Sequence, residues 1–146
     1  MVAPVDQGNL NRLRGSVVFA DFPGLGVTTP FLAKEAISLT FEGDAGQLLP
    51  TMTGGVGSPE PYQFATVEIH LLKTQALANA YKDQVETNVK VGSINVIGDA
   101  DAMENWQLEN CIIQSTAPGP FDGNNPTFTV RIRGIYYVNR DLWTAG

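Results

Sequence analysis

The chain has 146 residues, enough for a single domain with one core, and 43% of them are hydrophobic, as in a chain that folds. The net charge of −6 argues against a nucleic-acid-binding protein, which needs clustered Lys and Arg side chains to contact phosphates. The sequence has one cysteine, no apolar signal-peptide segment and no run of about 18 apolar residues, so we expect a soluble protein made in a cytoplasm, without an intrachain disulfide.

The N-terminal part of the chain predicts an arm, a strand and a turn. Residues 1–14 are polar and show no period, which is typical of an arm. Residues 16–20 are rich in β-branched and aromatic side chains and predict the first strand. In the turn that follows, Gly24 and Gly26 have the spacing of a dinucleotide-binding fingerprint, but Thr29 stands where its third glycine belongs. We therefore expect no nucleotide site there.

Two later segments alternate between apolar and polar residues. Residues 36–42 place Ile37, Leu39 and Phe41 on one face, and residues 62–72 place Val67, Ile69 and Leu71 on one face. Strict alternation is typical of a strand with one buried face. We expect the two strands to pair as an antiparallel ribbon with one apolar and one polar face. The residues of the polar face are Ser38, Thr40, Glu42, Thr66, Glu68 and His70.

The segment between these two strands, residues 43–62, is glycine-rich and has no period of its own. Connections longer than about 12–15 residues without internal structure are uncommon in compact domains, and most are functional or disordered. This one nevertheless contains apolar residues. The residues that we select as candidates for a contact with another subunit are Leu48, Leu49, Met52, Gly54, Gly55, Val56 and Gly57. The alternative is a disordered surface loop.

The middle of the chain predicts the only helix. In residues 74–87, Leu77, Tyr81 and Val85 recur every four residues and form one apolar stripe, with Thr74 in the position of an N-cap. We expect the stripe to pack against the apolar face of a sheet. Residues 89–96, interrupted by Gly92, predict one broken strand or two short ones.

Two further strands are predicted after the helix. In residues 106–115, Trp106, Leu108 and Ile112 have the same parity and are expected on one face. Turn residues fill 117–126, and residues 127–140 contain the strongest predicted strand, in which Gly134 marks a bulge or a close backbone approach. No strand–helix alternation repeats. We therefore expect one domain over residues 1–146, mainly β, an antiparallel sandwich or barrel with one flanking helix.

The sequence offers no convincing catalytic or metal-binding constellation. His70, the only histidine, has no nucleophile motif near it, and Cys111 lies among strand residues without a feature that lowers a thiol pKa. The acidic turn that begins at Asp99 lacks the glycine and glutamate of a calcium loop, because Glu104 and Asn110 occupy those positions. We expect no enzyme activity, no cofactor and no metal. Arg131 and Arg133 share a strand face and could bind phosphate, but in an acidic chain we expect them to pair with carboxylates across an interface.

Taken together, the order of elements resembles that of the tail tube proteins of tailed bacteriophages, which are related to the tubes of type VI secretion and of contractile bacteriocins. The resemblance covers residues 15–143. It rests on the two alternating strands with the long loop between them, the helix "TQALANAYKDQVET" and the final strand "FTVRIRGIYYVNRD". It implies a β-sandwich subunit that forms hexameric rings, and the rings stack into a hollow tube of the virion tail, assembled in the bacterial host cytoplasm.

The resemblance also implies partners. DNA and the tape measure protein pass through the lumen without specific binding, and a sheath protein, a baseplate and a tail terminator contact the tube. No membrane is involved. On this hypothesis the polar strand face lines an acidic lumen that repels phosphate, and the long loop reaches a neighbouring subunit or the next ring. A solvated sheet face is the alternative for the polar residues.

A binding module of another class, such as a carbohydrate-binding β-sandwich without an assembly role, is the second hypothesis for the whole chain. Such modules display aromatic side chains on a concave face. The aromatic candidates here are Trp106, Tyr136, Tyr137 and Trp143.

Overall fold

A computed structural model describes residues 8, 10, 15–74, 76–98, 105–118 and 123–144. Its strands are β1 (Ser16–Phe19), β2 (Leu32–Glu42), β3 (Gly46–Thr51), β4 (Gly54–Pro59), β5 (Tyr62–Leu72), β6 (Lys90–Ile97), β7 (Trp106–Ala117) and β8 (Thr127–Tyr137). The helices are α1 (Ala76–Thr87) and α2 (Asp141–Thr144), and two 3₁₀ turns are η1 (Pro23–Leu25) and η2 (Thr29–Phe31). The expected class is confirmed: the protein is mainly β, with a curled antiparallel sheet and a flanking helix.

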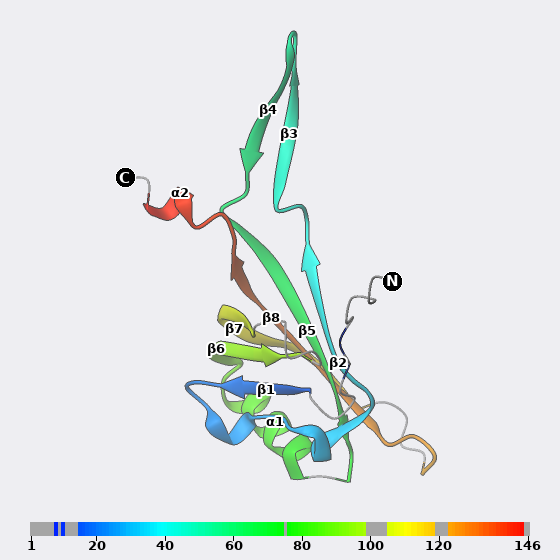
Figure 1. The fold of residues 1–146 in the computed structure, drawn as a ribbon. Helices are drawn as coiled ribbons and strands as arrows, with labels where there is room; N and C mark the ends of the chain where they lie inside the picture. Colours follow the sequence, from blue (N-terminus) through cyan, green and yellow to red (C-terminus); the bar gives the residue numbers. More distant parts are fainter. Residues whose placement is uncertain are drawn as a thin grey trace, which may run out of the picture.

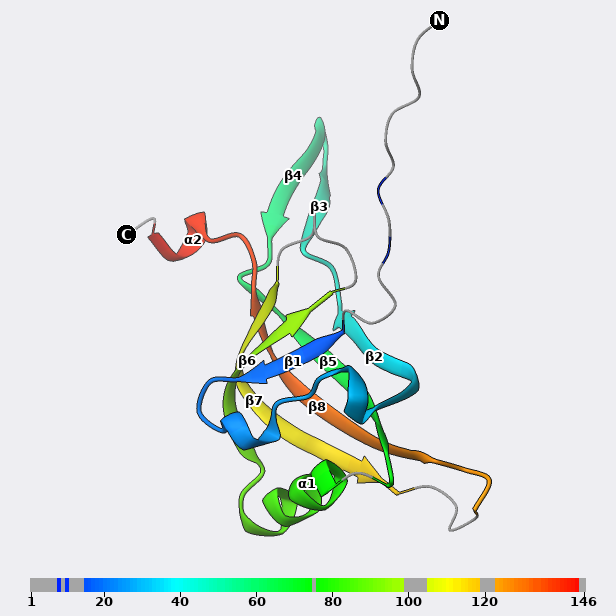
Figure 2. The ribbon, with the colours of Figure 1, turned by 60° about the horizontal axis from the view of Figure 1, so that its bottom comes forward.

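Six strands form one antiparallel sheet in the order β1-β6-β7-β8-β5-β2. The sheet curls on itself and α1 lies at its lower end, while β3 and β4 form a separate hairpin that projects from the upper end (Figures 1 and 2). The expected pairing of the two alternating segments is confirmed, because β2 and β5 are antiparallel neighbours over Ile37–Glu42. The hairpin and α1 therefore occupy opposite ends of the molecule.

The core lies between the curled sheet and α1. Val67, Ile69 and Leu71 of β5 are completely buried, as the alternation predicts, and so is Tyr81 of the helix. Tyr81 packs edge-on against Phe19, and its hydroxyl donates a hydrogen bond of 2.7 Å to the carbonyl oxygen of Leu25. Through Tyr81, the apolar stripe of α1 therefore contacts both η1 and β1.

Two bulges correct the expected strand pattern. The strand expected at residue 36 begins four residues earlier, at Leu32, and its pairing with β5 shifts between Leu32 and Ile37. Ala36, inside this irregular stretch, has a φ of 56°. A bulge changes which face successive side chains occupy, so the first part of the strand shows no strict alternation in the sequence.

The second bulge makes the prediction for Ile112 wrong. Asn110 has a φ of 50°, and the pairing of β7 with β8 shifts between Glu109 and Ile112. Beyond the bulge, Cys111 and Ile113 point into the core, while Ile112 is 38% exposed. Asn adopts a left-handed conformation more readily than most residues, which explains why the buried and exposed faces of β7 exchange at this position.

Glycines mark the close approaches inside the sheet. At Gly92, which has a φ of 74°, β6 continues as one strand across an irregular pairing with β7. At Gly134, a Cβ atom would lie 2.4 Å from Sγ of Cys111 and 3.3 Å from Cβ of Leu108. The predicted close backbone approach at Gly134 is therefore confirmed.

We expect Gly134→Ala to lower the free energy of unfolding by about 1–3 kcal/mol, because the added methyl group overpacks the space filled by the Cys111 sulfur. Removing that sulfur with Cys111→Ala should recover part of the loss, so the double variant should be more stable than the sum of the two single variants predicts. Urea denaturation of the four proteins measures this coupling, and strict additivity would contradict it.

Several predicted features lie outside the described residues. The expected arm 1–14 does, apart from residues 8 and 10, and so does the acidic stretch 99–104. The N-cap at Thr74 is followed by a residue outside the description, so it stays a prediction. In the described part of the chain, no helix has both the length and the apolar character that spanning a bilayer requires.

Candidate functional site

The polar residues predicted from β2 and β5 do share one face of the sheet, opposite the core. We call this surface the open face. In the register, Ser38 pairs with Glu68 and Thr40 with Thr66, while Glu68 pairs with Arg131 on the other side of β5. None of the side chains is buried. The open face of β2, β5 and β8 comprises Ser38, Thr40, Glu42, Phe64, Thr66, Glu68, His70, Thr129, Arg131, Arg133 and Ile135.

Both arginines of the open face are paired with carboxylates of the same chain. Arg131 lies directly opposite Glu68, and its Nε donates at 3.0 Å to Glu68 Oε1, which also accepts from Nη2 of the same guanidinium. Arg133 Nη2 lies 2.7 Å from Glu42 Oε2. We expected these arginines to pair with carboxylates across an interface, but in the structure their partners, Glu68 and Glu42, belong to the same chain. A role at an interface stays a prediction.

The Arg133–Glu42 pair spans three strands. Arg133 belongs to β8 and Glu42 to β2, and β5 runs between them. The guanidinium carbon of Arg133 lies 4.6 Å from the centroid of the Phe64 ring, so the side chain crosses β5 over an aromatic face. A cation is attracted to the negative face of an aromatic ring, which helps to hold this extended geometry.

The charges of the open face are close to electrical balance. Across β2, β5, β8 and the adjoining β7, it has the carboxylates of Glu42, Glu68 and Glu109 against the guanidinium groups of Arg131 and Arg133. Glu109 is held by the Ser93 hydroxyl and by the Gln107 amide, which donates at 2.8 Å. The net charge of this described surface is therefore about −1 rather than strongly negative.

The two residues considered for chemistry, His70 and Cys111, lie in different surroundings. His70 is half-buried, and its Nδ1 lies 3.3 Å from Thr129 Oγ1. Burial raises the pKa of Cys111 to about 12, with the charge of Glu109 as a second cause. The thiol is therefore protonated, and a poor nucleophile, at neutral pH. Among the described residues, no group of three His, Cys, Asp or Glu side chains could hold a metal ion.

The segment expected to be an irregular loop is instead a regular β-hairpin, so that expectation is wrong. β3 pairs with β4 from Gly46↔Pro59 to Thr51↔Gly54, and Met52 and Thr53 form the turn. Two prolines and four glycines disfavour strand formation, so the sequence lacks the composition that usually identifies strands. The pairing of Leu49 with Val56 and of Leu48 with Gly57 places apolar side chains on both faces of the ribbon.

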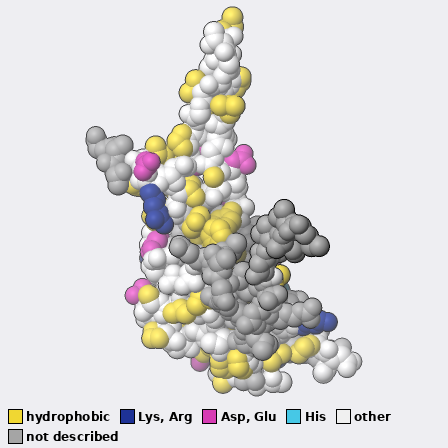
Figure 3. Space-filling model, in the orientation of Figure 1, with side chains coloured by type: hydrophobic (Ala, Val, Ile, Leu, Met, Phe, Trp, Pro, Cys, Tyr) yellow, Lys and Arg dark blue, Asp and Glu magenta, His cyan; other side chains and the backbone are white. Residues whose placement is uncertain are grey.

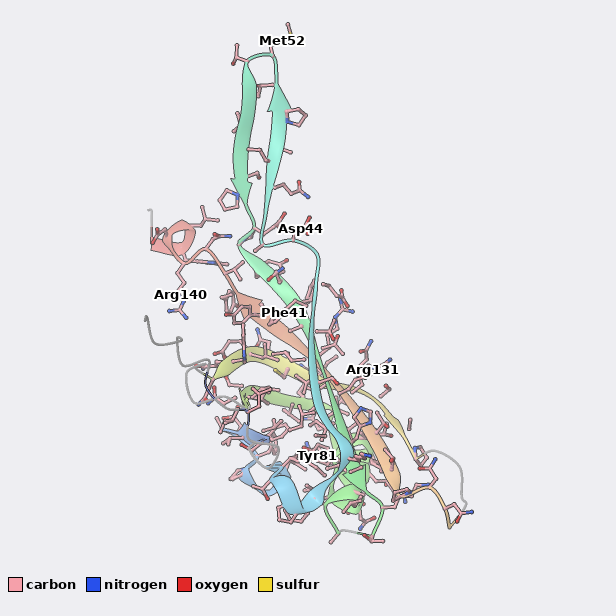
Figure 4. The ribbon with its side chains drawn as sticks, turned by 45° about the vertical axis from the view of Figure 1, so that its right-hand side comes forward. Phe41, Asp44, Met52, Tyr81, Arg131 and Arg140 are labelled. Atoms are coloured by element: carbon pink, nitrogen blue, oxygen red, sulfur yellow. The ribbon has the colours of Figure 1, made fainter. Side chains whose placement is uncertain are left out.

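The hairpin is almost entirely exposed. Every residue of β3 and β4 except Ser58 is exposed, Leu48 to 77%, and Met52 at the tip is fully exposed. The stretch 46–59 contains no charged residue. Hydrophobic side chains follow the hairpin to its tip in Figure 3, and Figure 4 shows Met52 at the tip, far from Tyr81 of the core. All of the predicted subunit-contact residues lie on this projecting ribbon.

The C-terminal segment holds the base of the hairpin, which the sequence did not indicate. The Asn139 side-chain amide donates to the carbonyl oxygens of Ala45 at 2.8 Å and of Glu60 at 2.7 Å. The indole of Trp143 donates to the Pro61 carbonyl at 3.1 Å and packs edge-on against Tyr137. The hairpin therefore leaves the sheet in a fixed direction.

The four aromatic residues considered for ligand binding separate into two places. Trp106 and Tyr136 contact one another and Phe41, with ring centroids 5.0–5.5 Å apart, and pack against the core. Tyr137 and Trp143 lie beside the base of the hairpin. The structure therefore does not bring the four rings together on one concave surface.

The fold defines a curled antiparallel β-sheet protein with one flanking helix. The sequence matches no protein-family model, and no curated protein is significantly similar to it. Its function is therefore inferred from the open face and the hairpin.

Proposed function

We propose that this protein is a structural subunit of a tube of the phage tail type, in which rings of identical subunits stack around a lumen. The observation that carries the proposal is the uncharged hairpin with Leu48, Leu49, Met52 and Val56 exposed. Burying one such side chain is worth about 1.5–3 kcal/mol, so a covered hairpin would stabilise an assembly appreciably. A ribbon with apolar side chains on both faces fits a place between other protein surfaces.

The direction of the hairpin supports an assembly that extends along one axis. The hairpin projects from one end of the molecule and α1 lies at the other (Figure 1). A hairpin that contacts the next ring meets a surface different from itself, and such heterologous contacts form open filaments unless they close into a ring. The hydrogen bonds from Asn139 and Trp143 hold the hairpin in place before assembly, which lowers the entropy lost on binding.

The edges of the sheet support lateral association. β2 is an edge strand of eleven residues, and among the described strands it pairs only with β5. An unpaired edge of this length presents backbone donors and acceptors to another chain, and closure of several sheets into one barrel removes the edge. In this proposal the open face lines the lumen, six subunits complete a ring by resemblance to the phage family, and DNA passes without specific binding.

Electron microscopy of the purified full-length protein tests the proposal directly. We expect negatively stained samples at high protein concentration to contain rings or tubes, and light scattering to detect a species several times larger than 15.7 kDa. Assembly should increase with protein concentration, because several chains associate to form each ring. A protein that stays monomeric at every concentration and salt condition, with no particle in the micrographs, would overturn the proposal.

A further inference from the structure

We propose that Glu42 and Glu68 neutralise the two arginines of the open face, so that this face does not bind the phosphate backbone of nucleic acid. Arg131 and Arg133 then form a latent phosphate-binding pair, which becomes active only when the carboxylates are removed. The proposal concerns the same open face and rests on the proposed tube only for its biological meaning, the passage of DNA. The electrostatic claim applies to any assembly state.

The two arginines have the placement of a phosphate-binding pair. They are two residues apart on β8, and their side chains lie on the same face of the sheet. An arginine presents several N–H donors in a planar fork that matches a phosphate group, and charge-assisted contacts of this kind are strong. Both side chains keep partial solvent exposure, 49% for Arg131 and 34% for Arg133, so a polyanion has access to them.

The two glutamates occupy part of these donors, and the Nε of Arg133 is buried and therefore not accessible to a phosphate. Glu68 Oε1 accepts from both Nε and Nη2 of Arg131, and Glu42 Oε2 accepts from Nη2 of Arg133. A phosphate would have to compete with a carboxylate that is already in place, on the adjacent strand β5 for Arg131 and two strands away, on β2, for Arg133. Glu42 and Glu68 also add two negative charges within a few ångströms of the arginines, which opposes the approach of a polyanion.

The remaining charges of the protein have less influence on this surface. At an ionic strength of about 0.1 M, exposed charges more than about 10 Å apart are largely screened from one another. The overall negative charge therefore does not by itself decide whether the open face binds phosphate, and the local pairs do. Exposed ion pairs add little to folding stability, so their removal should leave the sheet intact. Glu109 keeps its hydrogen bonds to Ser93 and Gln107 and is left unchanged in the test.

The test compares the binding of a fluorescent 20-nucleotide single-stranded DNA by wild type and variants, measured by anisotropy at 50 mM and 200 mM salt. Glu42→Gln/Glu68→Gln removes both carboxylate charges and keeps the side-chain shapes. Asp83→Asn/Glu86→Gln is the matched control, because it changes the net charge equally and releases Lys82 from its pair with Glu86 on α1. A third protein combines Glu42→Gln/Glu68→Gln with Arg131→Gln/Arg133→Gln, and a fourth has Arg131→Gln/Arg133→Gln alone.

We expect Glu42→Gln/Glu68→Gln to bind the DNA, and wild type, the control and the combined variant not to. Two phosphate contacts on a single strand give a salt slope of about −1.4, so affinity should fall about sevenfold between 50 and 200 mM salt. The single variants Glu42→Gln and Glu68→Gln should be intermediate. Thermal unfolding of each protein verifies that the fold is retained.

Two results would overturn the inference. One is DNA binding by Glu42→Gln/Glu68→Gln that is no stronger than binding by the control. The other is wild-type binding that disappears in Arg131→Gln/Arg133→Gln, because the arginines would then be active while paired. Micrographs of the same samples keep the two proposals separate. DNA binding without tubes would support the inference and count against the tube, and tubes without DNA binding would do the reverse.

Discussion

Replacing residues 46–59 with Asn-Gly is expected to abolish ring and tube formation while the sheet stays folded. The hairpin contributes no residue to the buried core, and its side chains contact solvent rather than the sheet, so its removal exposes little new surface. Ala45 and Glu60 flank the base, where the Glu60 amide already donates to the Ala45 carbonyl at 3.0 Å. Asn-Gly, a preferred two-residue hairpin turn, can therefore connect the two segments of the chain there.

The measurement is negative-stain microscopy together with urea denaturation. We expect no tubes from the shortened protein, and a free energy of unfolding within about 1 kcal/mol of the value for the dissociated wild type, as for changes on an exposed surface. The control is a full-length protein with Thr53→Ser in the turn, which keeps the apolar residues and should assemble normally. Tubes of normal length from the shortened protein would show that the hairpin is not an assembly element.

Tyr81→Ala is expected to produce the largest loss of stability of any single change considered, about 3–5 kcal/mol, by analogy with other large aromatic-to-alanine changes in cores. Tyr81 is completely buried, and its ring connects α1 to Phe19. Domains of this kind are stable by about 5–15 kcal/mol, so the variant should be partly unfolded in mild denaturant. Tyr62→Ala, at an exposed tyrosine of β5, is the matched control and should cost far less.

The hydroxyl of Tyr81 has a separate and smaller effect. Tyr81→Phe removes the hydrogen bond to the Leu25 carbonyl and should cost about 1 kcal/mol, since one buried acceptor loses its donor. Urea denaturation of the Tyr81 and Tyr62 variants measures all three losses. If Tyr81→Phe and Tyr81→Ala proved equally destabilising, the packing of the ring would not be the main contribution of this residue.

Tyr81 also predicts a dependence of stability on pH. Burial raises the pKa of its hydroxyl above the ordinary value of 10.0, so the folded protein keeps the proton after the unfolded chain has lost it. This contribution is fully present below pH 10 and decreases as the pH rises above that value, because ionisation then favours the unfolded state. The difference in unfolding free energy between wild type and Tyr81→Phe should therefore shrink above pH 10.

Several parts of the fold follow from local patterns in the sequence. The alternation in residues 62–72 predicts β5 with the bounds that the structure has, and the four-residue recurrence of Leu77, Tyr81 and Val85 predicts α1 and its buried stripe. These predictions succeed because the periods of strand and helix determine which side chains can be buried together. The antiparallel class follows because no strand–helix unit repeats.

The mistakes occur where the backbone departs from a regular period. Positive φ angles at Ala36 and Asn110 accompany register shifts that change the faces of β2 and β7, so Ile112 is exposed although its parity matches Leu108. The hairpin was not predicted because glycine and proline are rare in strands. The pairing between β3 and β4 outweighs the low strand propensity of these residues. Neither effect has a reliable local signal in a single sequence.

For the candidate site, the sequence by itself determined which residues lie on the polar face of β2 and β5, because alternation is a local property of each strand. Only the tertiary structure decided how the charges of that face combine. Arg131 and Glu68 are 63 residues apart in the chain, and Arg133 and Glu42 are 91 apart. They come into contact because β5 lies between β8 and β2 and pairs with both strands. This strand order is determined by the burial of the whole sheet against α1. The fixed direction of the hairpin depends in the same way on Asn139 and Trp143, far from it in sequence but adjacent to its base in the fold.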